Sequence, residues 1–181
     1  MARRLIVAMA AVLVSLGTPG APPAAASDQP LNPSVSGPFT GASVFDSTSA
    51  CRFFHQVYDA TYSTKHGRSG SFHLDGCVDF EPIQFVYAGS FVLTTPNRAV
   101  LSGTVTGVIG GAPASDPCED PTAFAESLDF TLALTHGTKR FKHATGTIHL
   151  VGTWCSPALP GVPGSISGVL AGALERAHPA A

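Results

Sequence analysis

The sequence is poor in charge, and beyond its first residues it has no long hydrophobic run. Only 12% of the 181 residues are charged, and the formal net charge is −2. No segment approaches the roughly 20 apolar residues of a membrane-spanning helix. Proteins that bind nucleic acid or an anionic membrane surface need a basic face, which this composition does not favour. We therefore expect neither a membrane anchor nor a nucleic-acid partner.

The first residues follow the order of a secretory signal peptide. Arg3 and Arg4 precede an apolar stretch over 5–14 that is too short to span a bilayer. Small residues then lead to Ala26, where we expect cleavage and release of a secreted, extracellular chain. The residues around the arginine pair match a twin-arginine signal poorly, so general secretion is the favoured route. The style of this segment is typical of bacterial proteins.

The rest of the chain has a suitable length for one domain with a hydrophobic core. Prolines and small residues over 27–38 predict a flexible lead-in after the signal peptide over 1–26. The folded domain is expected over 39–176. Nothing in the sequence predicts a particular oligomeric state.

Four cysteines, an even number in an exported chain, predict two disulfides. Three connectivities are possible, and the order along the chain favours Cys51 with Cys77 and Cys118 with Cys155. Each bond would stabilise the fold by about 3 to 4 kcal/mol. A structural zinc site is less favoured because no two cysteines have the close spacing that such sites use.

Alternation of apolar and polar residues predicts an all-β fold, and no segment has sustained helical periodicity. Eight sequential antiparallel strands suggest a closed barrel, because closure removes edges that would otherwise aggregate, and a two-sheet β-sandwich is the alternative. Pro96 and Asn97 suit the centre of a β-turn between two of the strands. The strands are expected near residues 39–45, 53–62, 72–80, 85–94, 99–109, 128–135, 147–154 and 165–174.

A glycine-rich segment over 134–152 is expected to join two strands. The residues that define its pattern are Gly137, Thr138, Phe141, Ala144 and Gly146. This pattern resembles the strand, loop and strand signature of the allene oxide cyclase and dirigent-like β-barrels, a superfamily that includes many uncharacterised exported bacterial proteins. The resemblance implies an eight-stranded antiparallel barrel with an apolar interior, in which the glycines permit the turn and the phenylalanine packs beneath it. It carries over no catalytic residue.

The same segment departs from that signature at three positions. His136, Lys139 and His143 stand where the family usually has glycine. A residue other than glycine is costly at a positive backbone φ, so we expect this loop to follow a different path. Lys139 and His143, with Arg140 and Lys142, form a basic cluster that would suit an anionic ligand or glycan, although a solvated loop is the favoured interpretation.

Seven histidines invite the hypothesis of a metal site, but their spacing does not support it. No pair lies two residues apart on one strand, and we expect hydrogen-bonded or solvated histidines on the outer strand faces, with no metal. No Gly-x-Ser-x-Gly motif marks a hydrolase nucleophile. Asp75 and Asp79 would suit acid–base chemistry only across a cleft, and acids on the outer face of a strand are the simpler interpretation.

The favoured hypothesis is a secreted barrel that binds a small apolar or amphipathic molecule in its interior, without a cofactor. Glycines on the later strands favour some empty interior space, although close backbone packing would need the same residues. The first alternative is a cofactor-free isomerase or cyclase of the allene oxide cyclase type. It requires a polar group inside the barrel, and the candidates are His73, Asp75 and His149. The second alternative, a structural or surface-interaction protein, needs no site and is favoured by a solid interior.

Overall fold

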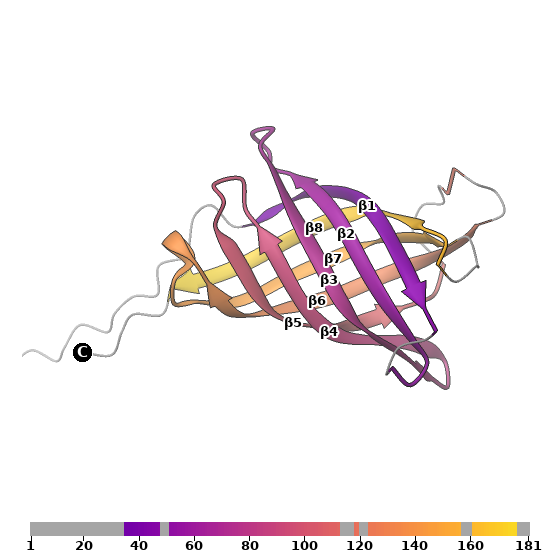
Figure 1. The fold of residues 1–181 in the computed structure, drawn as a ribbon. Coiled ribbons are helices and arrows are strands. Elements are labelled where there is room, and N and C mark those ends of the chain that lie inside the picture. Colours follow the sequence, from indigo (N-terminus) through magenta and orange to yellow (C-terminus); the bar gives the residue numbers. More distant parts are fainter. Residues whose placement is uncertain (1–34, 48–50, 113–117, 120–122, 157–160, 177–181) are drawn as a thin grey trace, which may run out of the picture.

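The computed structural model describes residues 35–47, 51–112, 118–119, 123–156 and 161–176. Eight antiparallel strands in chain order close into a barrel (Figure 1), which confirms the predicted fold over the sandwich alternative. The first strand begins at Ser36, before the expected start at Phe39. The strands are β1 (Ser36–Asp46), β2 (Phe54–Ser63), β3 (Ser69–Glu81), β4 (Gln84–Thr94), β5 (Val100–Ile109), β6 (Phe124–Gly137), β7 (Ala144–Ser156) and β8 (Gly164–Arg176).

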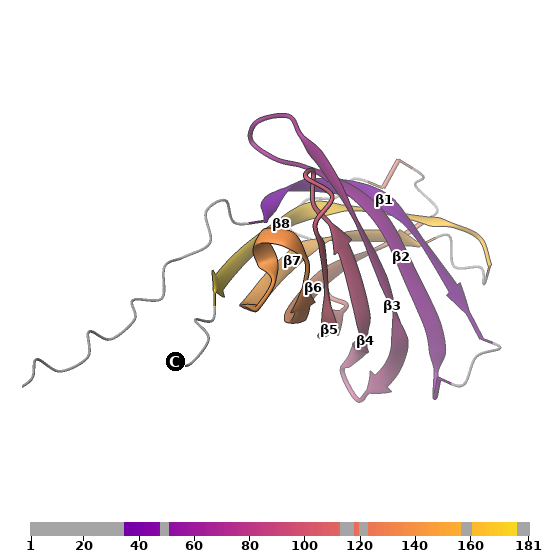
Figure 2. The ribbon, with the colours of Figure 1, turned by 60° about the vertical axis from the view of Figure 1, so that its left-hand side comes forward.

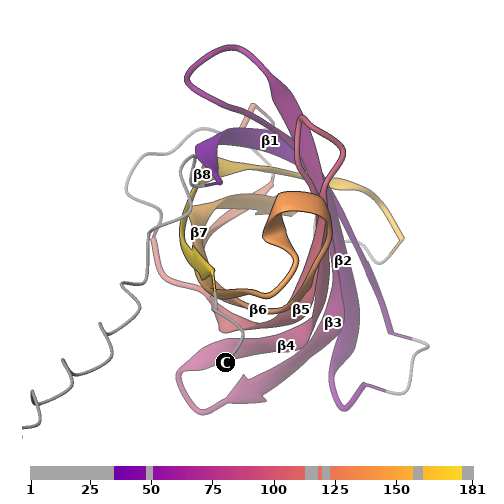
Figure 3. The same ribbon diagram turned by 90° about the vertical axis from the view of Figure 1, so that its left-hand side faces the viewer.

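Each strand pairs with the next along the chain, and β8 pairs with β1 to complete the ring (Figures 1 and 2). Because neighbouring strands alternate in direction, every second connection lies at the same end of the barrel. The connections β1–β2, β3–β4, β5–β6 and β7–β8 lie at one end. The connections β2–β3, β4–β5 and β6–β7 lie at the other end, which faces the viewer in Figure 3.

Aromatic side chains fill the centre of the barrel. The rings of Tyr58, Tyr87 and Phe130 have no exposed surface. Tyr87 stacks on Phe130 with ring centroids 4.9 Å apart, and Tyr58 meets both rings edge-on at 5.5 and 5.6 Å. Side chains can fill the interior of an eight-stranded barrel in this way. The predicted ligand cavity therefore does not pass through the middle.

Inward-facing glycines make room for these and other rings. A Cβ atom at Gly107 would lie 2.5 Å from Cδ1 of Phe130, and one at Gly168 would lie 2.8 Å from Cζ of Phe39. Both distances are too short for a real contact. Of the two interpretations that the sequence leaves open for its glycines, close packing therefore applies at these positions, and empty space does not.

Two disulfides join outer positions of the barrel. Cys51 is bonded to Cys77 with 5.3 Å between Cα atoms, and Cys118 is bonded to Cys155 with 5.5 Å between Cα atoms. This is the connectivity that the sequence favours, and it indicates an oxidising compartment. The signal peptide predicted up to Ala26 lies outside the described residues. In the part that is described, no helix has the length and apolar character to cross a bilayer.

Candidate functional site

The barrel end at which β1 leads to β2 and β7 leads to β8 carries a cluster of aromatic residues, and we call it the aromatic end. A cavity of about 140 Å³ opens there. Because side chains alternate along each strand, the wall residues of this cavity point toward the barrel axis. They lie near the ends of their strands, so they border the opening. The cavity is lined by Phe45, Phe54, Phe85, Phe124, Glu126, Trp154 and Ser156.

The aromatic wall of the cavity is built by contacts between strands that are distant in the sequence. Phe45 on β1 meets Trp154 on β7 edge-on with ring centroids 6.3 Å apart, and meets Phe54 on β2 at 5.5 Å. Phe54 in turn lies 6.2 Å from Phe85 on β4. Such ring pairs contribute about 0.5–1.5 kcal/mol each beyond the burial of their area, so the wall is a packed structure.

Large apolar side chains also remain exposed at the aromatic end. Phe53, Phe80 and Phe124 are 52%, 55% and 62% exposed, and Ile83 in the β3–β4 turn is 92% exposed. Phe53 stacks on Phe85, so this exposed group continues directly into the cavity wall. Exposed apolar groups that adjoin a cavity commonly mark a place where a ligand or partner binds.

Glu126 and Ser156 are the polar residues in this otherwise aromatic wall. Glu126 on β6 forms part of the wall, and burial raises the pKa of its carboxyl group above the usual range. The indole Nε1 of Trp154 is buried and has no hydrogen-bond partner among the described residues. A Cβ atom at Gly164 would lie 2.8 Å from this nitrogen and 3.1 Å from Oγ of Ser43, so the two polar atoms border the same small space.

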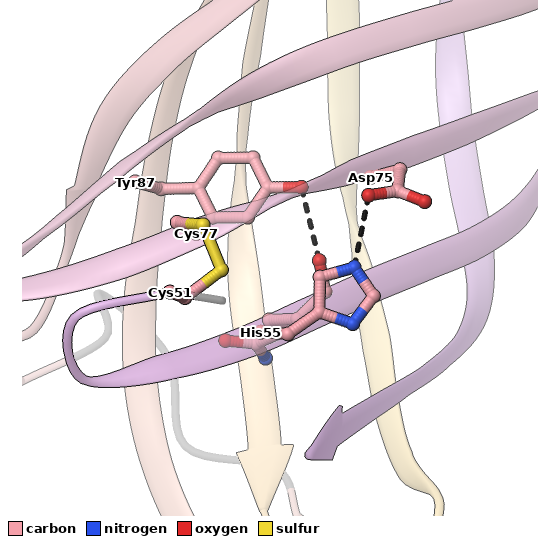
Figure 4. A network of polar contacts seen from close by, with 6 residues as sticks. Cys51, His55, Asp75, Cys77 and Tyr87 are labelled. Atoms are coloured by element: carbon pink, nitrogen blue, oxygen red, sulfur yellow. Dashed lines mark hydrogen bonds and ion pairs between the residues drawn. A yellow bond between two sulfur atoms is a disulfide. The ribbon is translucent and has the colours of Figure 1, made fainter. Parts of the chain in front are cut away.

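A second layer of polar atoms lies deeper, between the cavity and the central rings. Gln56 on β2 is fully buried, and within the described ranges neither atom of its side-chain amide has a partner. The hydroxyl group of Tyr87 donates a hydrogen bond of 3.1 Å to the backbone oxygen of Gln56 (Figure 4). Burial raises the pKa of Tyr58 and of Tyr87, so both phenols keep their protons. A buried polar atom without a partner costs about 1–3 kcal/mol, so such a layer is uncommon in a purely structural core.

The structure places two of the predicted catalytic candidates on the outer face of the barrel. Asp75 accepts from His55, with 2.9 Å between Oδ1 and Nε2 (Figure 4), and His73 pairs with Asp59 at 2.8 Å. Both pairs connect β2 with β3 and are partly exposed to solvent. Neither faces the interior that the cyclase hypothesis requires, and a catalytic role for His73 or Asp75 remains a prediction.

The third candidate, His149, is also exposed on an outer face. Its Nδ1 lies 3.4 Å from Oγ1 of Thr131 on the neighbouring strand. Among the residues that the structure describes, no three histidine, cysteine, aspartate or glutamate side chains converge as metal ligands would. The structure therefore does not bring His73, Asp75 and His149 together as one site.

The glycine-rich segment of the resemblance forms the β6–β7 connection at the opposite end. Residues Lys139–Phe141 form a single 3-10 turn, η1, which lies over the opening of the barrel in Figure 3. Phe141 is fully buried beneath it. Thr138 Oγ1 accepts a 2.8 Å hydrogen bond from the backbone of Val100, which ties this turn to β5. The remaining motif residues, Gly137, Ala144 and Gly146, lie at the ends of β6 and β7.

Sequence reasoning missed Glu126, Trp154 and Gln56 as possible site residues. A signal was present, because Glu126 has the same alternation as the inward-facing Leu128 and Phe130. An acid in the apolar phase of a strand is either at the end of the core or in a site. Glu126 meets both descriptions, because the end of β6 at which it lies also borders the cavity.

A scan against models of known protein families, a search of curated proteins and a search of solved structures each gave no match for this chain.

Proposed function

We propose that this protein is exported through the predicted signal peptide and binds a small amphipathic molecule at the aromatic end. The observation that carries the proposal is the cavity whose wall combines four phenylalanines and Trp154 with the polar residues Glu126 and Ser156. Pockets for small molecules have this composition, with a mainly apolar wall and a few polar groups that fix orientation. Because the centre is filled, the proposed site lies at the mouth of the barrel, in contrast to the interior cavity expected from the sequence.

The volume of the cavity limits the ligand. An apolar cavity of about 150 Å³ is large enough for benzene, so 140 Å³ suits one aromatic ring or a short alkyl chain. The exposed rings of Phe53 and Phe124 would cover a longer apolar part outside the cavity. A hydroxyl or amine group of the ligand would meet Glu126 in the cavity wall.

A cofactor-free isomerase or cyclase is the second candidate, and Glu126 favours it. Burial raises the pKa of this carboxyl group, and a raised pKa helps a carboxyl group to hold the proton that a general acid donates. The closed eight-stranded barrel is compatible with the resemblance to allene oxide cyclase and dirigent-like proteins. Membership of that superfamily is part of this proposal.

The first experiment is native mass spectrometry of the protein from the culture medium of its host, before and after organic extraction. A small molecule that disappears on extraction would support the proposal and identify a candidate ligand. Trp154 then provides a direct readout, because it is the only tryptophan of the chain and lies in the cavity wall. Cyclohexanol and 1-hexanol serve as test ligands, and we expect both to change its fluorescence with saturation.

Two phenylalanines provide a matched pair of variants. Phe124 lines the cavity and Phe80 does not, although both are at the aromatic end and are similarly exposed. Phe124→Ala should weaken the binding of cyclohexanol several-fold, and Phe80→Ala should leave it unchanged. If the wild-type protein gives no saturable response, or if both variants lose it equally, the cavity is not the site. The exposed aromatic residues would then favour a surface-interaction protein.

A further inference from the structure

The opposite end of the barrel has the reverse chemistry and encloses a second cavity of about 160 Å³. We call it the basic end. Its three connections, 64–68, 95–99 and 138–143, hold no acidic residue. They contain the basic residues Lys65, Arg68, Arg98, Lys139, Arg140 and Lys142, together with His66 and His143. The mild net negative charge of the chain therefore conceals a local concentration of positive charge.

The cavity is formed by groups from all three connections and from the start of β1. Lys65, His66 and Arg68 come from the β2–β3 connection, and Arg140 comes from η1. Arg140 is held over the ring of Phe141, with its guanidinium carbon 4.8 Å from the ring centroid. This contact keeps a cation at the opening of the barrel. The remaining lining residues are Val35, Ser36, Tyr62, Thr64, Thr95, Pro96 and Asn97.

Asn97 in the β4–β5 turn ties the basic connections to one another. Its side-chain oxygen accepts a hydrogen bond from the Arg68 guanidinium group, and its backbone oxygen accepts one of 2.7 Å from Nζ of Lys139. Three connections that are far apart in the sequence are thus joined at their tips. The shared contacts with Asn97 thus gather cations from separate connections at one end of the barrel.

A buried phenol completes the wall of this cavity. Tyr62 is 1% exposed, and its hydroxyl group has no hydrogen-bond partner in the part of the chain that the structure describes. Burial raises the pKa of Tyr62 to about 12, and the nearby Arg140 acts in the lowering direction, so the phenol keeps its proton and can donate it. A buried donor in a cationic cavity has an obvious acceptor in an oxyanion.

The backbone of the same end is strained where the basic residues lie. Arg98, Lys139 and His143 have φ values of 55°, 54° and 66°, and they are the non-glycine residues with positive φ in the described ranges. Glycine at these positions would relieve the strain, and the glycine-rich signature that this segment resembles has it at two of them. Residues held in this region cost about 1–3 kcal/mol each and gather at ligand sites. The positive φ values at this end thus coincide with basic residues.

We propose that the basic end is a second binding site, distinct from the aromatic end, which takes the phosphate group of a small molecule. Lysine and arginine side chains from separate connections approach the cavity from different directions, which suits a tetrahedral dianion better than a planar carboxylate. Tyr62 donates to one oxygen of the phosphate from inside the barrel. Lys65, Arg68 and Arg140 neutralise the others from the rim.

Isothermal titration with inorganic phosphate, against chloride at equal ionic strength, tests the proposal. We expect one saturable site per chain. Tyr62→Phe keeps the ring that packs on Gly70 and removes only the hydroxyl group, so it should weaken phosphate binding by about tenfold without unfolding the protein. The fluorescence of Trp154 should not change, because that residue lies at the aromatic end. Failure here is therefore distinguishable from failure of the proposed function.

Lys65→Gln and Lys142→Gln form a matched pair of charge variants. Both lysines are exposed at the basic end, but only Lys65 lines the cavity. We expect Lys65→Gln to weaken phosphate binding by roughly fivefold and Lys142→Gln to leave it nearly unchanged. An absence of heat with phosphate in the wild-type protein overturns the proposal. Equal losses in the two variants also overturn it, because they would indicate diffuse attraction and no built site.

Vesicles establish the source of the phosphate group. Sedimentation with phosphatidylcholine vesicles that contain phosphatidic acid, but not with pure phosphatidylcholine, would assign the site to a lipid headgroup if inorganic phosphate competes. Phosphate binding without sedimentation would assign it to a soluble phosphate ester. Sedimentation that phosphate does not displace and that Tyr62→Phe does not reduce contradicts the assignment to this cavity.

Discussion

The phenol ring of Tyr87 lies almost parallel to Phe130, with 19° between their planes and 4.9 Å between their centroids. The two residues come from β4 and β6, which are not hydrogen-bonded to each other because β5 separates them. The stack therefore joins two strands that share no hydrogen bonds, across the interior of the barrel.

Removal of this ring should destabilise the fold strongly. We expect Phe130→Ala to lower the free energy of unfolding by about 3–5 kcal/mol, because it deletes a fully buried ring and leaves a cavity between two tyrosines. Urea unfolding followed by circular dichroism measures the loss. Phe80→Ala removes the same ring from an exposed position and should change the unfolding free energy by less than about 1 kcal/mol. A small loss at Phe130 would mean that the centre of the barrel is loosely packed.

Glycine at position 168 should be required for packing. A Cβ atom there would lie 2.8 Å from Phe39 Cζ and 2.6 Å from the Gly152 Cα. Gly168→Ala should therefore lower the free energy of unfolding by about 1–3 kcal/mol. In an open interior the same change would stabilise by about 0.4–1 kcal/mol, since it restricts the unfolded chain. A decrease in the free energy of unfolding would thus indicate a packed interior at this position, and an increase would indicate an open one. Ser167→Ala, on the exposed face of the same strand, is the control.

The tyrosines should not ionise while the protein is folded. All three tyrosines of the chain, Tyr58, Tyr62 and Tyr87, are buried, and burial raises the pKa of each. The folded state disfavours phenolate, so stability should fall as the pH rises above the ordinary tyrosine pKa of about 10. Ultraviolet titration should show phenolate only as the fold is lost, whereas in guanidinium chloride it should appear near pH 10. A tyrosine that titrates near pH 10 with circular dichroism unchanged contradicts this burial.

Glu126 should destabilise the protein at neutral pH. Burial raises the pKa of its carboxyl group, so the folded state prefers the protonated form, and stability decreases as the pH rises from the ordinary value of about 4.3 through the raised one. Glu126→Gln removes the ionisable group, so this decrease in stability with rising pH should be absent from the variant. It should be more stable than the wild type at neutral pH, by up to about 1 kcal/mol because the group is only partly buried, and the difference should vanish in acid.

Denaturant unfolding of both proteins at several pH values measures this difference. The matched change Glu175→Gln, at an exposed position on β8, should produce no comparable dependence on pH. A difference between Glu126→Gln and the wild type that stays constant with pH would show that the carboxyl group is not responsible.

Much of the fold could be predicted because the strands follow a simple rule. Their inward residues are apolar and their outward residues polar, so the period of two alone identifies β3 and β6. The short turn at Thr95–Arg98 forms as its proline and asparagine indicate. The backbone N–H of Arg98 donates to the oxygen of Thr95, and that of Thr95 donates to the oxygen of Ala99, both at 2.8 Å. The outward position of His73 and Asp75 also follows from alternation, which favours a solvated pair over a site inside the barrel.

The two ends of the barrel could not be predicted from single segments. From the sequence, Lys139 and Arg140 indicate only an isolated basic loop, because their proximity to Lys65 and Arg68 depends on which connections share an end. That information is contained in the strand order, since alternate connections of an up-and-down barrel coincide in space. The aromatic end was missed for the same reason: each phenylalanine looks like an ordinary core residue until the register places it at the last inward position of its strand.

Both disulfides attach to the barrel at its aromatic end, through Cys77 near the end of β3 and Cys155 near the end of β7. Among the described residues, the basic end is held by hydrogen bonds, packing and the η1 turn over its opening, and it has no disulfide. Local stability should therefore differ between the two ends, since covalent cross-links restrain only the aromatic end. Fraying should begin at the basic end, where amide protons exchange first, and an anion seated there would act as the missing clamp.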